Sequence, residues 1–230
     1  MLDLKKFEQR LDEALANETK ESLNLWLIKN KMKKHIQEIK ENGYTILPQQ
    51  LGQNQISIFL NLIKEQYEET KDKISQDTPY LNKSQPNLYN LQSKRGWNLF
   101  LDQITENKDL EQILIHFLND KWYKQIPQDQ PNYILRSFGA RSSNDALPLH
   151  IDSFIPYKGE EVIAMQVAIV LEDMTEENGC TVVIPGSHQS GQYANNGYYN
   201  QAIPLTPKAG DLVLWDSRIW HGTTKNTTDS

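Results

Sequence analysis

Two histidines and one aspartate in the last third of this chain are of the residue types, and at a spacing, that suit a divalent metal ion. His150 and Asp152 are separated by one residue, and in a β-strand residues i and i+2 point to the same face. His221 follows 69 positions after Asp152 (221 − 152), enough for several strands before the chain returns. Two histidines and a carboxylate are the ligands of non-haem Fe(II) oxygenases, although zinc accepts the same donors. The alternative for the His150–Asp152 pair is a structural role at the end of a strand.

Such an iron site needs its three protein ligands on one face of the metal. The opposite face then binds a bidentate 2-oxo acid and O₂. Two neutral imidazoles and one carboxylate leave a ferrous ion with a single residual positive charge, which favours an anionic cosubstrate.

Other polar residues stand within the predicted strands around the triad. Gln166 interrupts the apolar run of residues 162–169, so its amide must find a partner or face a cavity. We predict that Gln166 contacts the cosubstrate and that Thr181 is a weaker candidate of the same kind. His188 is expected to support a turn or a ligand, and Asp211 to fix a turn.

Apolar stripes at helical spacing dominate the first half of the chain. They predict helices over residues 3–42, with a break near residue 18, over 54–73 and over 109–120. A short strand is predicted over 44–47. The polar, turn-rich residues 75–98 are predicted to form a loop, with a strand around 88–91, that acts as a substrate lid.

From Pro131 onwards short β-rich runs replace the helical stripes. The predicted strands are 132–138, 162–171, 181–184, 202–205, 211–215 and 219–222. Helices followed by many short strands indicate an α+β fold whose β part is a sandwich or a barrel-like jelly roll. We expect one domain over 1–230, in which 1–130 form the helical support and lid and 131–230 form the metal-binding β core.

The composition is that of an ordinary globular protein, with 38% hydrophobic and 23% charged residues. A net charge of −6 argues against nucleic acid as a partner. The one cysteine, Cys180, excludes an intrachain disulfide and fits a reducing compartment. No apolar run is long enough to cross a membrane, and the charged N-terminus resembles no secretory signal. We therefore expect a cytoplasmic protein.

Several motifs beyond the triad resemble those of the phytanoyl-CoA dioxygenase family. They are His150-x-Asp152, the segment Glu177-Asn178-Gly179-Cys180 running on to Pro185-Gly186-Ser187-His188, then Gly210-Asp211 and His221-Gly222 with Asn226. The resemblance covers roughly residues 130–230. It implies a double-stranded β-helix (jelly roll, cupin-like) core against which the N-terminal helices pack. It also implies Fe(II), 2-oxoglutarate as cosubstrate, hydroxylation with release of succinate and CO₂, and the ligands His150, Asp152 and His221.

One part of the family pattern is not found in the sequence. Family members carry an arginine about ten residues beyond the distal histidine, where its planar guanidinium binds the distal carboxylate of 2-oxoglutarate. The sequence ends nine residues after His221, at Ser230 (230 − 221). We expect that the chain is truncated just before this arginine, and Arg136 is the substitute that we favour within it. Arg218 lies closer to His221 in sequence but is expected to point away.

The sequence thus predicts a dioxygenase that acts on a small organic molecule together with O₂, with no nucleic acid or membrane partner. Two alternatives stay open. One is a metal-binding β-barrel without oxygenase activity, such as a zinc hydrolase or a cupin-like isomerase, and the other is an inactive binding module.

Overall fold

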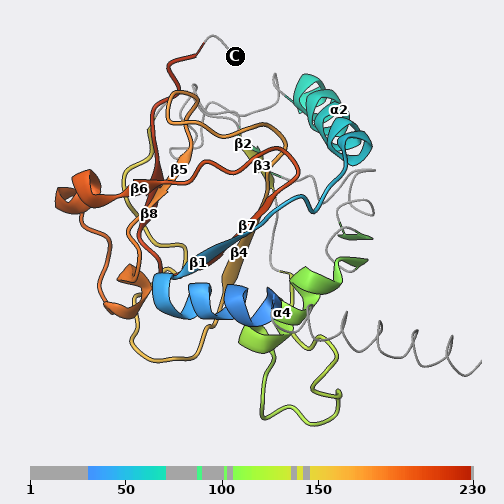
Figure 1. Cartoon of the computed structure of the whole chain (residues 1–230), viewed down its shortest axis with the longest axis vertical. Helices are drawn as coiled ribbons and strands as arrows, with labels where there is room; N and C mark the ends of the chain where they lie inside the picture. Colours follow the sequence, from blue (N-terminus) through green and yellow to red (C-terminus); the bar gives the residue numbers. More distant parts are fainter. Residues whose placement is uncertain are drawn as a thin grey trace, which may run out of the picture.

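A computed structural model describes residues 31–70, 87–89, 101–102, 106–135, 139–141 and 146–228 (Figure 1). Its first described element is a helix over residues 31–42. The elements that follow are β1 (Tyr44–Leu47), α2 (Gln53–Thr70), β2 (Asn87–Tyr89), α4 (Lys108–Leu118), β3 (Gly139–Arg141), β4 (Met165–Ile169), β5 (Thr181–Val183), the 3₁₀ turns η2 (Ser187–Gln189) and η3 (Asn196–Gln201), β6 (Ile203–Pro204), β7 (Leu212–Asp216) and β8 (His221–Thr223).

The described strands form two antiparallel three-stranded sheets and one antiparallel two-stranded sheet. The first sheet has the order β1-β7-β4, the second has the order β6-β5-β8, and β2 pairs with β3. Figure 1 shows the two larger sheets on opposite sides of the β part of the molecule. Strands that are far apart in sequence are neighbours in both sheets, so contacts between distant segments of the chain build this core.

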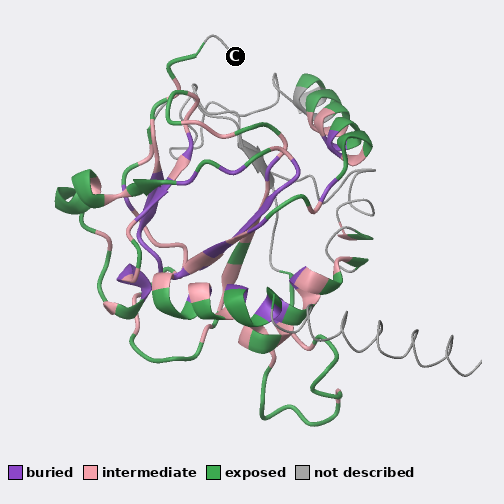
Figure 2. Cartoon of the chain, viewed as in Figure 1, coloured by how far each residue is buried: buried purple, intermediate pink, exposed green. Residues whose placement is uncertain are grey.

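Strand β7 shows most clearly how the layers are arranged. Leu212 and Leu214 belong to a core cluster shared with the helices, whereas Val213 packs in a second cluster with Val183 of the other sheet. Successive side chains of a strand point to opposite faces, so both faces of β7 are covered. Figure 2 shows β1 and β7 as a largely buried band across the middle of the molecule.

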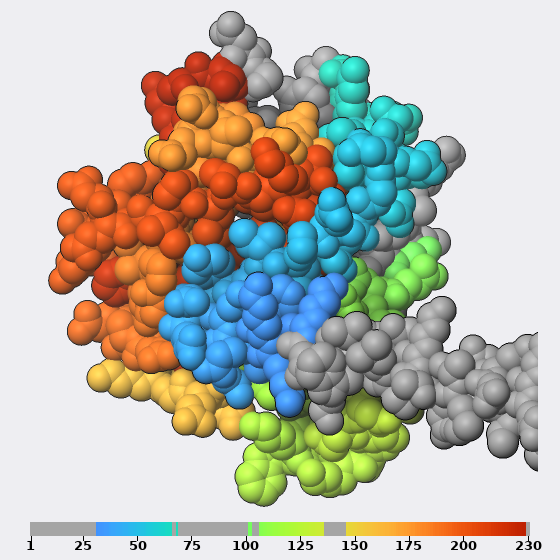
Figure 3. Space-filling model, viewed as in Figure 1, coloured from blue at the N-terminus to red at the C-terminus, as the bar shows by residue number. Residues whose placement is uncertain are grey.

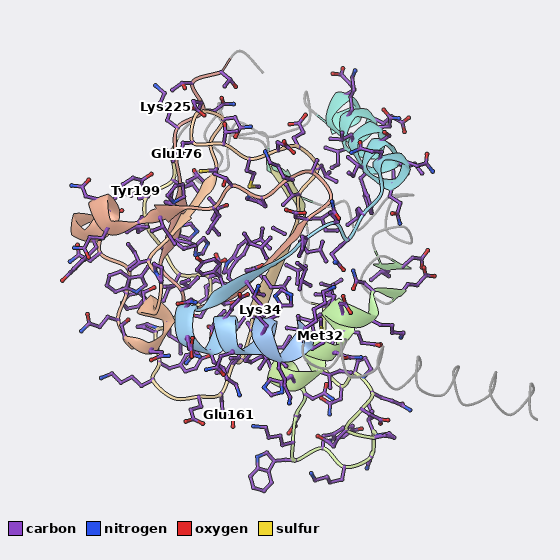
Figure 4. All side chains as sticks on the ribbon, viewed as in Figure 1. Met32, Lys34, Glu161, Glu176, Tyr199 and Lys225 are labelled. Atoms are coloured by element: carbon purple, nitrogen blue, oxygen red, sulfur yellow. The ribbon has the colours of Figure 1, made fainter. Side chains whose placement is uncertain are left out.

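Helices cover the outer face of the first sheet. Met32 and Ile39 of helix 31–42 pack in the same cluster as Ile113 of α4. Figure 3 shows the residues of this helix on the face of the molecule turned to the viewer, and Figure 4 shows Met32 at the end of the helix nearer α4. Helix α4 buries its stripe of Leu110, Ile113 and Leu114. Its N-terminus is capped by Asn107, whose side-chain oxygen accepts a hydrogen bond from Leu110 N at 3.0 Å.

The predicted elements are largely confirmed where the structure describes them. The strand over 44–47 is found at those bounds, and the helices predicted over 54–73 and 109–120 are α2 and α4. The strand predicted over 132–138 is wrong for residues 132–135, which have no strand pairing, and residues 136–138 lie outside the described residues. Side chains hold that segment instead, because Asn132 and Asn119 each accept a hydrogen bond from a main-chain N–H across the loop.

The α+β expectation is confirmed at the level of helices packed on antiparallel sheets. Most of the predicted lid, residues 75–98, and the helix predicted before residue 31 lie outside the described residues. Among the helices that the structure describes, none combines the length and the apolar character that a membrane span requires.

Candidate metal centre

The backbone brings the two histidines of the predicted triad face to face. His150 N donates to His221 O at 2.8 Å, and His221 N donates to His150 O at 3.0 Å. This reciprocal exchange is the hydrogen-bonded pair of an antiparallel ladder, so both side chains leave the sheet on the same side. Their ring centroids lie 4.2 Å apart.

Each imidazole is held by its own main chain in the same way. His150 Nδ1 lies 2.9 Å from Pro148 O, and His221 Nδ1 lies 3.0 Å from Ile219 O. A carbonyl only accepts, so each Nδ1 carries a proton, and in the neutral ring each Nε2 therefore presents its lone pair. This is the tautomer that a metal-binding histidine needs, and the second hydrogen bond fixes the orientation of the ring.

Asp152 completes the group. Its Oδ2 lies 3.2 Å from His221 Nε2, and its Oδ1 lies 3.7 Å from His150 Nε2. One ligand atom from each of the three residues lies within 4.8 Å of the others, so the group can hold a metal ion. His221 is buried, whereas His150 and Asp152 are partly exposed, so the group is open to solvent on the side of residues 150–152.

The prediction that His150 and Asp152 share a regular strand is wrong in detail. Only His150 forms a bridge, and the backbone bends at Asp152. The reason is that Ser217 O accepts both Asp152 N at 2.8 Å and Ser153 N at 3.0 Å. The turn before β8 therefore sets the position of the carboxylate, while β8 itself sets the two histidines.

Asp152 is held in its charged form. Burial alone would raise its pKa, but in the metal-free protein the hydrogen bond and charge of His221 and the charge of His150, which these rings supply when Nε2 is also protonated, outweigh burial together with a smaller contribution from Trp215. The pKa of Asp152 therefore lies below its ordinary value. A carboxylate that stays ionised at neutral pH is suited to bind a cation.

Trp215 is a further residue of this centre; from sequence its expected role is core packing first and pocket lining second. Its ring lies 5.4 Å from the His221 ring, centroid to centroid. Its indole N–H is buried and lacks a partner of regular hydrogen-bond geometry among the described residues. It makes the smallest of the contributions that lower the pKa of Asp152, after those of His221 and His150. The alternation of side chains along β7 could have indicated this position from sequence, because it places Trp215 on the same face as Val213.

The proposed cosubstrate residues Gln166 and Thr181 both lie on inward faces. Gln166 is directly opposite Trp215 in the pairing of β4 with β7, and it is exposed although its neighbours are partly buried. Thr181 is opposite Thr223. It lies two residues before Val183, which is opposite His221, so Thr181 and His221 are on the same face of the sheet. Side chains opposite each other share a face, so both residues stand on the side of the metal centre. Their contact with a cosubstrate stays a prediction.

Of the two arginines considered for the distal carboxylate of the cosubstrate, the structure describes Arg218 only. Arg136 lies outside the described residues. Arg218 is buried and binds Asp216, with Nη2 at 2.6 Å from Oδ2, and its Nη1 donates to Gly159 O at 2.8 Å. Its guanidinium also lies over the Tyr157 ring at 4.3 Å. Arg218 thus ties the loop after Asp152 to the end of β7.

The Pro-Gly-Ser-His segment, residues 185–188, connects helix 31–42 to the residue before His221. Gly186 N donates to Asn42 O at 2.9 Å, and His188 Nε2 lies 3.2 Å from Lys40 O, so the segment caps the C-terminus of helix 31–42. Ser187 Oγ accepts from Trp220 N at 2.8 Å, directly before His221. Among the described residues, His188 is not part of the three-residue group, in line with its predicted supporting role.

Asp211 fixes a turn, as predicted. Its Oδ2 accepts from Lys208 N at 2.8 Å, and its Oδ1 accepts from Gln49 N at 2.9 Å. The second bond joins the turn before β7 to the end of β1.

The fold and the geometry define a protein with a two-histidine, one-carboxylate group beside paired antiparallel sheets. The family model described as Phytanoyl-CoA dioxygenase (PhyH) matches residues 39–230. The chain belongs to this family.

Named relatives are similar over shorter stretches. Dioxygenase af480 of Aspergillus fumigatus is 34% identical over 94 residues, which is 39% of this chain and 30% of that protein. Dioxygenase FUM3 of Gibberella moniliformis is 41% identical over 61 residues, which is 26% of this chain and 20% of that protein. The matched part of this chain thus spans less than a third of the length of either relative.

Solved structures show the same fold at low sequence identity. The epimerase SnoN in complex with Fe³⁺, alpha ketoglutarate and nogalamycin RO aligns with a TM-score of 0.59 and 15% identity, over 88% of this chain and 80% of that one. The non-haem alpha ketoglutarate dependent carbocyclase SnoK, from nogalamycin biosynthesis, aligns with a TM-score of 0.58 and 20% identity, over 86% and 79%.

Proposed function

We propose that this chain is an Fe(II)- and 2-oxoglutarate-dependent dioxygenase that hydroxylates a small organic substrate and releases succinate and CO₂. The observation that carries the proposal is the geometry of the triad, in which both Nε2 atoms of His150 and His221 face the Asp152 carboxylate. Membership of the dioxygenase family supports it.

The residues fit a ferrous ion by their chemistry. Two neutral imidazoles and an ionised carboxylate give a three-donor face with one negative charge, as non-haem iron centres use. Bound Fe(II) would supply the activation of O₂ through oxidative decarboxylation of 2-oxoglutarate. The protein holds the two rings in the required tautomer, keeps Asp152 charged and leaves the side of residues 150–152 accessible.

The remaining expectations about this chain follow from the same proposal. The two sheets would be the opposed walls of a double-stranded β-helix within one domain over 1–230. Gln166 and Thr181 would contact 2-oxoglutarate, and Arg136 is the candidate within this chain for its distal carboxylate. The inward faces of β4 and β5 support the first two assignments.

Replacement of the carboxylate tests the proposal. In Asp152→Ala, binding of Fe(II) under anaerobic conditions should weaken by more than about 100-fold. Loss of a residue that only hydrogen-bonds to a ligand costs about 10–100-fold, and Asp152 is proposed to be a ligand itself. Succinate formation from 2-oxoglutarate should disappear. Fe(II) binding is measured by metal titration, and the Fe(II)-bound protein should gain a visible absorption band when 2-oxoglutarate is added.

Asp173→Ala is the matched control, because that exposed carboxylate pairs with Lys208 at 3.1 Å and is not part of the triad. It should bind Fe(II) as the parent does. Equal Fe(II) affinity in Asp152→Ala and the parent would sink the proposed site. Zinc binding with no response to 2-oxoglutarate would favour the hydrolase or isomerase alternative, and a protein that cannot be loaded with metal would favour the binding module.

A further inference from the structure

The chain makes a strained turn directly after Asp152. Ile155 N donates to Ser153 O at 2.8 Å, so the turn closes over three residues, and its central residue, Phe154, has φ +63°. A γ-turn with a positive φ at its centre is rare and strained, and a bulky residue seldom occupies this region. Ser153 Oγ donates to Ile155 O at 3.1 Å and reinforces the turn.

This turn displays apolar side chains to solvent beside the candidate metal centre. Phe154 is 68% exposed and Ile155 is 65% exposed. Phe154 follows Asp152 by two residues, so their Cα atoms are at most about 7 Å apart. The triad is open on the side of residues 150–152, from which the turn continues. Phe154 therefore belongs to the segment that adjoins the accessible side of the triad.

The segments on both sides of Phe154 are fixed to the core. Before it, Asp152 N and Ser153 N both bind Ser217 O. After it, Arg218 donates to Gly159 O and lies over the Tyr157 ring. The position of the turn is therefore set by buried groups at the end of β7, which is the context in which strain at a functional site persists.

We propose that Phe154 is a specificity-determining residue that contacts the substrate, and that the substrate carries an uncharged apolar group, aliphatic or aromatic, next to the carbon that reacts. This inference rests on the proposed function and names the substrate class of that site. Ligand sites combine apolar walls with a few polar groups that orient the ligand. Here Phe154 and Ile155 supply the apolar part, and the triad supplies the polar part.

Phe154→Gly tests the proposal without straining the fold, because glycine adopts a positive φ at no steric cost. The probe is N-phenyl-1-naphthylamine, an uncharged aromatic compound whose fluorescence rises in apolar surroundings. The parent chain should bind it, and Phe154→Gly should bind at least about tenfold more weakly, as expected for loss of a buried phenyl contact. Phe154→Leu should recover part of the affinity.

Trp122→Gly is the control, because this residue is 92% exposed in the loop after α4. It should bind the probe as the parent does. A parent that binds no probe, or equal binding by the parent and Phe154→Gly, would overturn the inference. Loss of binding in Trp122→Gly instead would do the same, because it would place the apolar contact elsewhere.

The same samples distinguish failure of the proposed function from failure of the inference about Phe154. Fe(II) binding and 2-oxoglutarate-dependent succinate release are measured on the same preparations. If both are intact while probe binding ignores Phe154, only the inference about the substrate fails. If the parent does not bind Fe(II) while probe binding depends on Phe154, the dioxygenase assignment fails and the apolar contact stands.

Discussion

The two histidines of the candidate metal centre are prepared for metal binding by their own backbone. In each, Nδ1 binds the carbonyl oxygen two residues earlier, of Pro148 for His150 and of Ile219 for His221. The ring orientations and tautomers are thus determined locally, without a dedicated side chain. Less conformational freedom remains to be lost when a metal binds.

Trp215→Phe should weaken Fe(II) binding by about tenfold, the low end of what loss of an outer hydrogen-bond donor costs. The change keeps an aromatic ring beside His221 and removes the N–H that helps to lower the pKa of Asp152. The measurement is the Fe(II) dissociation constant from anaerobic titration. Trp122→Phe is the control, and equal dissociation constants for Trp215→Phe and the parent would contradict the role given to Trp215.

At the level of elements, the centre depends on how tightly β8 packs against the segment before His150. A Cβ added at Gly222 would lie 2.5 Å from Leu147 O and 3.2 Å from Pro148 O. Both are backbone atoms, so the neighbour cannot yield by rotating a side chain. Gly222 is therefore required for the close approach that pairs His221 with His150.

Gly222→Ala should push residues 147–150 away from β8. The free energy of unfolding should fall by about 1–3 kcal/mol, the usual cost of overpacking, and Fe(II) binding should weaken because the two histidines separate. Denaturant unfolding and metal titration measure the two effects. Gly52→Ala is the control, since the atom nearest to its added Cβ is 3.7 Å away. Unchanged stability and metal affinity in Gly222→Ala would show that the segment moves freely.

On the scale of the whole molecule, buried histidines link stability to pH. His35 is buried between helix 31–42 and β1, where its Nδ1 lies 2.7 Å from Thr45 Oγ1. Burial lowers the pKa of His35 below its ordinary value of 6.5, and the nearby Glu38 only partly offsets this. Below pH 6.5 the unfolded chain therefore binds a proton that the folded chain resists.

The stability that neutral His35 contributes should be complete above pH 6.5 and should be lost as the pH falls towards the folded pKa. Denaturant unfolding of the metal-free protein between pH 7.5 and about 5 measures this loss. His35→Gln should show a shallower decline, because glutamine keeps a polar partner for Thr45 and takes up no proton. The remaining slope comes from groups such as His188, whose pKa burial also lowers. An identical slope in variant and parent would contradict the assignment.

The sequence by itself determined much of the element content. Helical stripes marked α2 and α4, and short β-rich runs placed β1 at its bounds and most of the later strands within a few residues. Residue types at motif spacing also singled out His150, Asp152 and His221, which the fold brings together. These features follow from local physics, because periodicity decides which face is buried and donor type decides which residues suit a metal.

Tertiary structure alone decided the geometry around those residues. A hydrogen bond from Asp152 N to Ser217 O, rather than a regular strand, places Asp152 beside the histidines. Arg218 binds Asp216 and Gly159 O. Phe154 takes a positive φ that no sequence pattern predicts. The physical reason is contact with segments distant in sequence: Ser217 O holds the main chain at Asp152 and at Ser153, directly before Phe154, and Gly159 O accepts a hydrogen bond from Arg218. Local propensity contains no information about such partners.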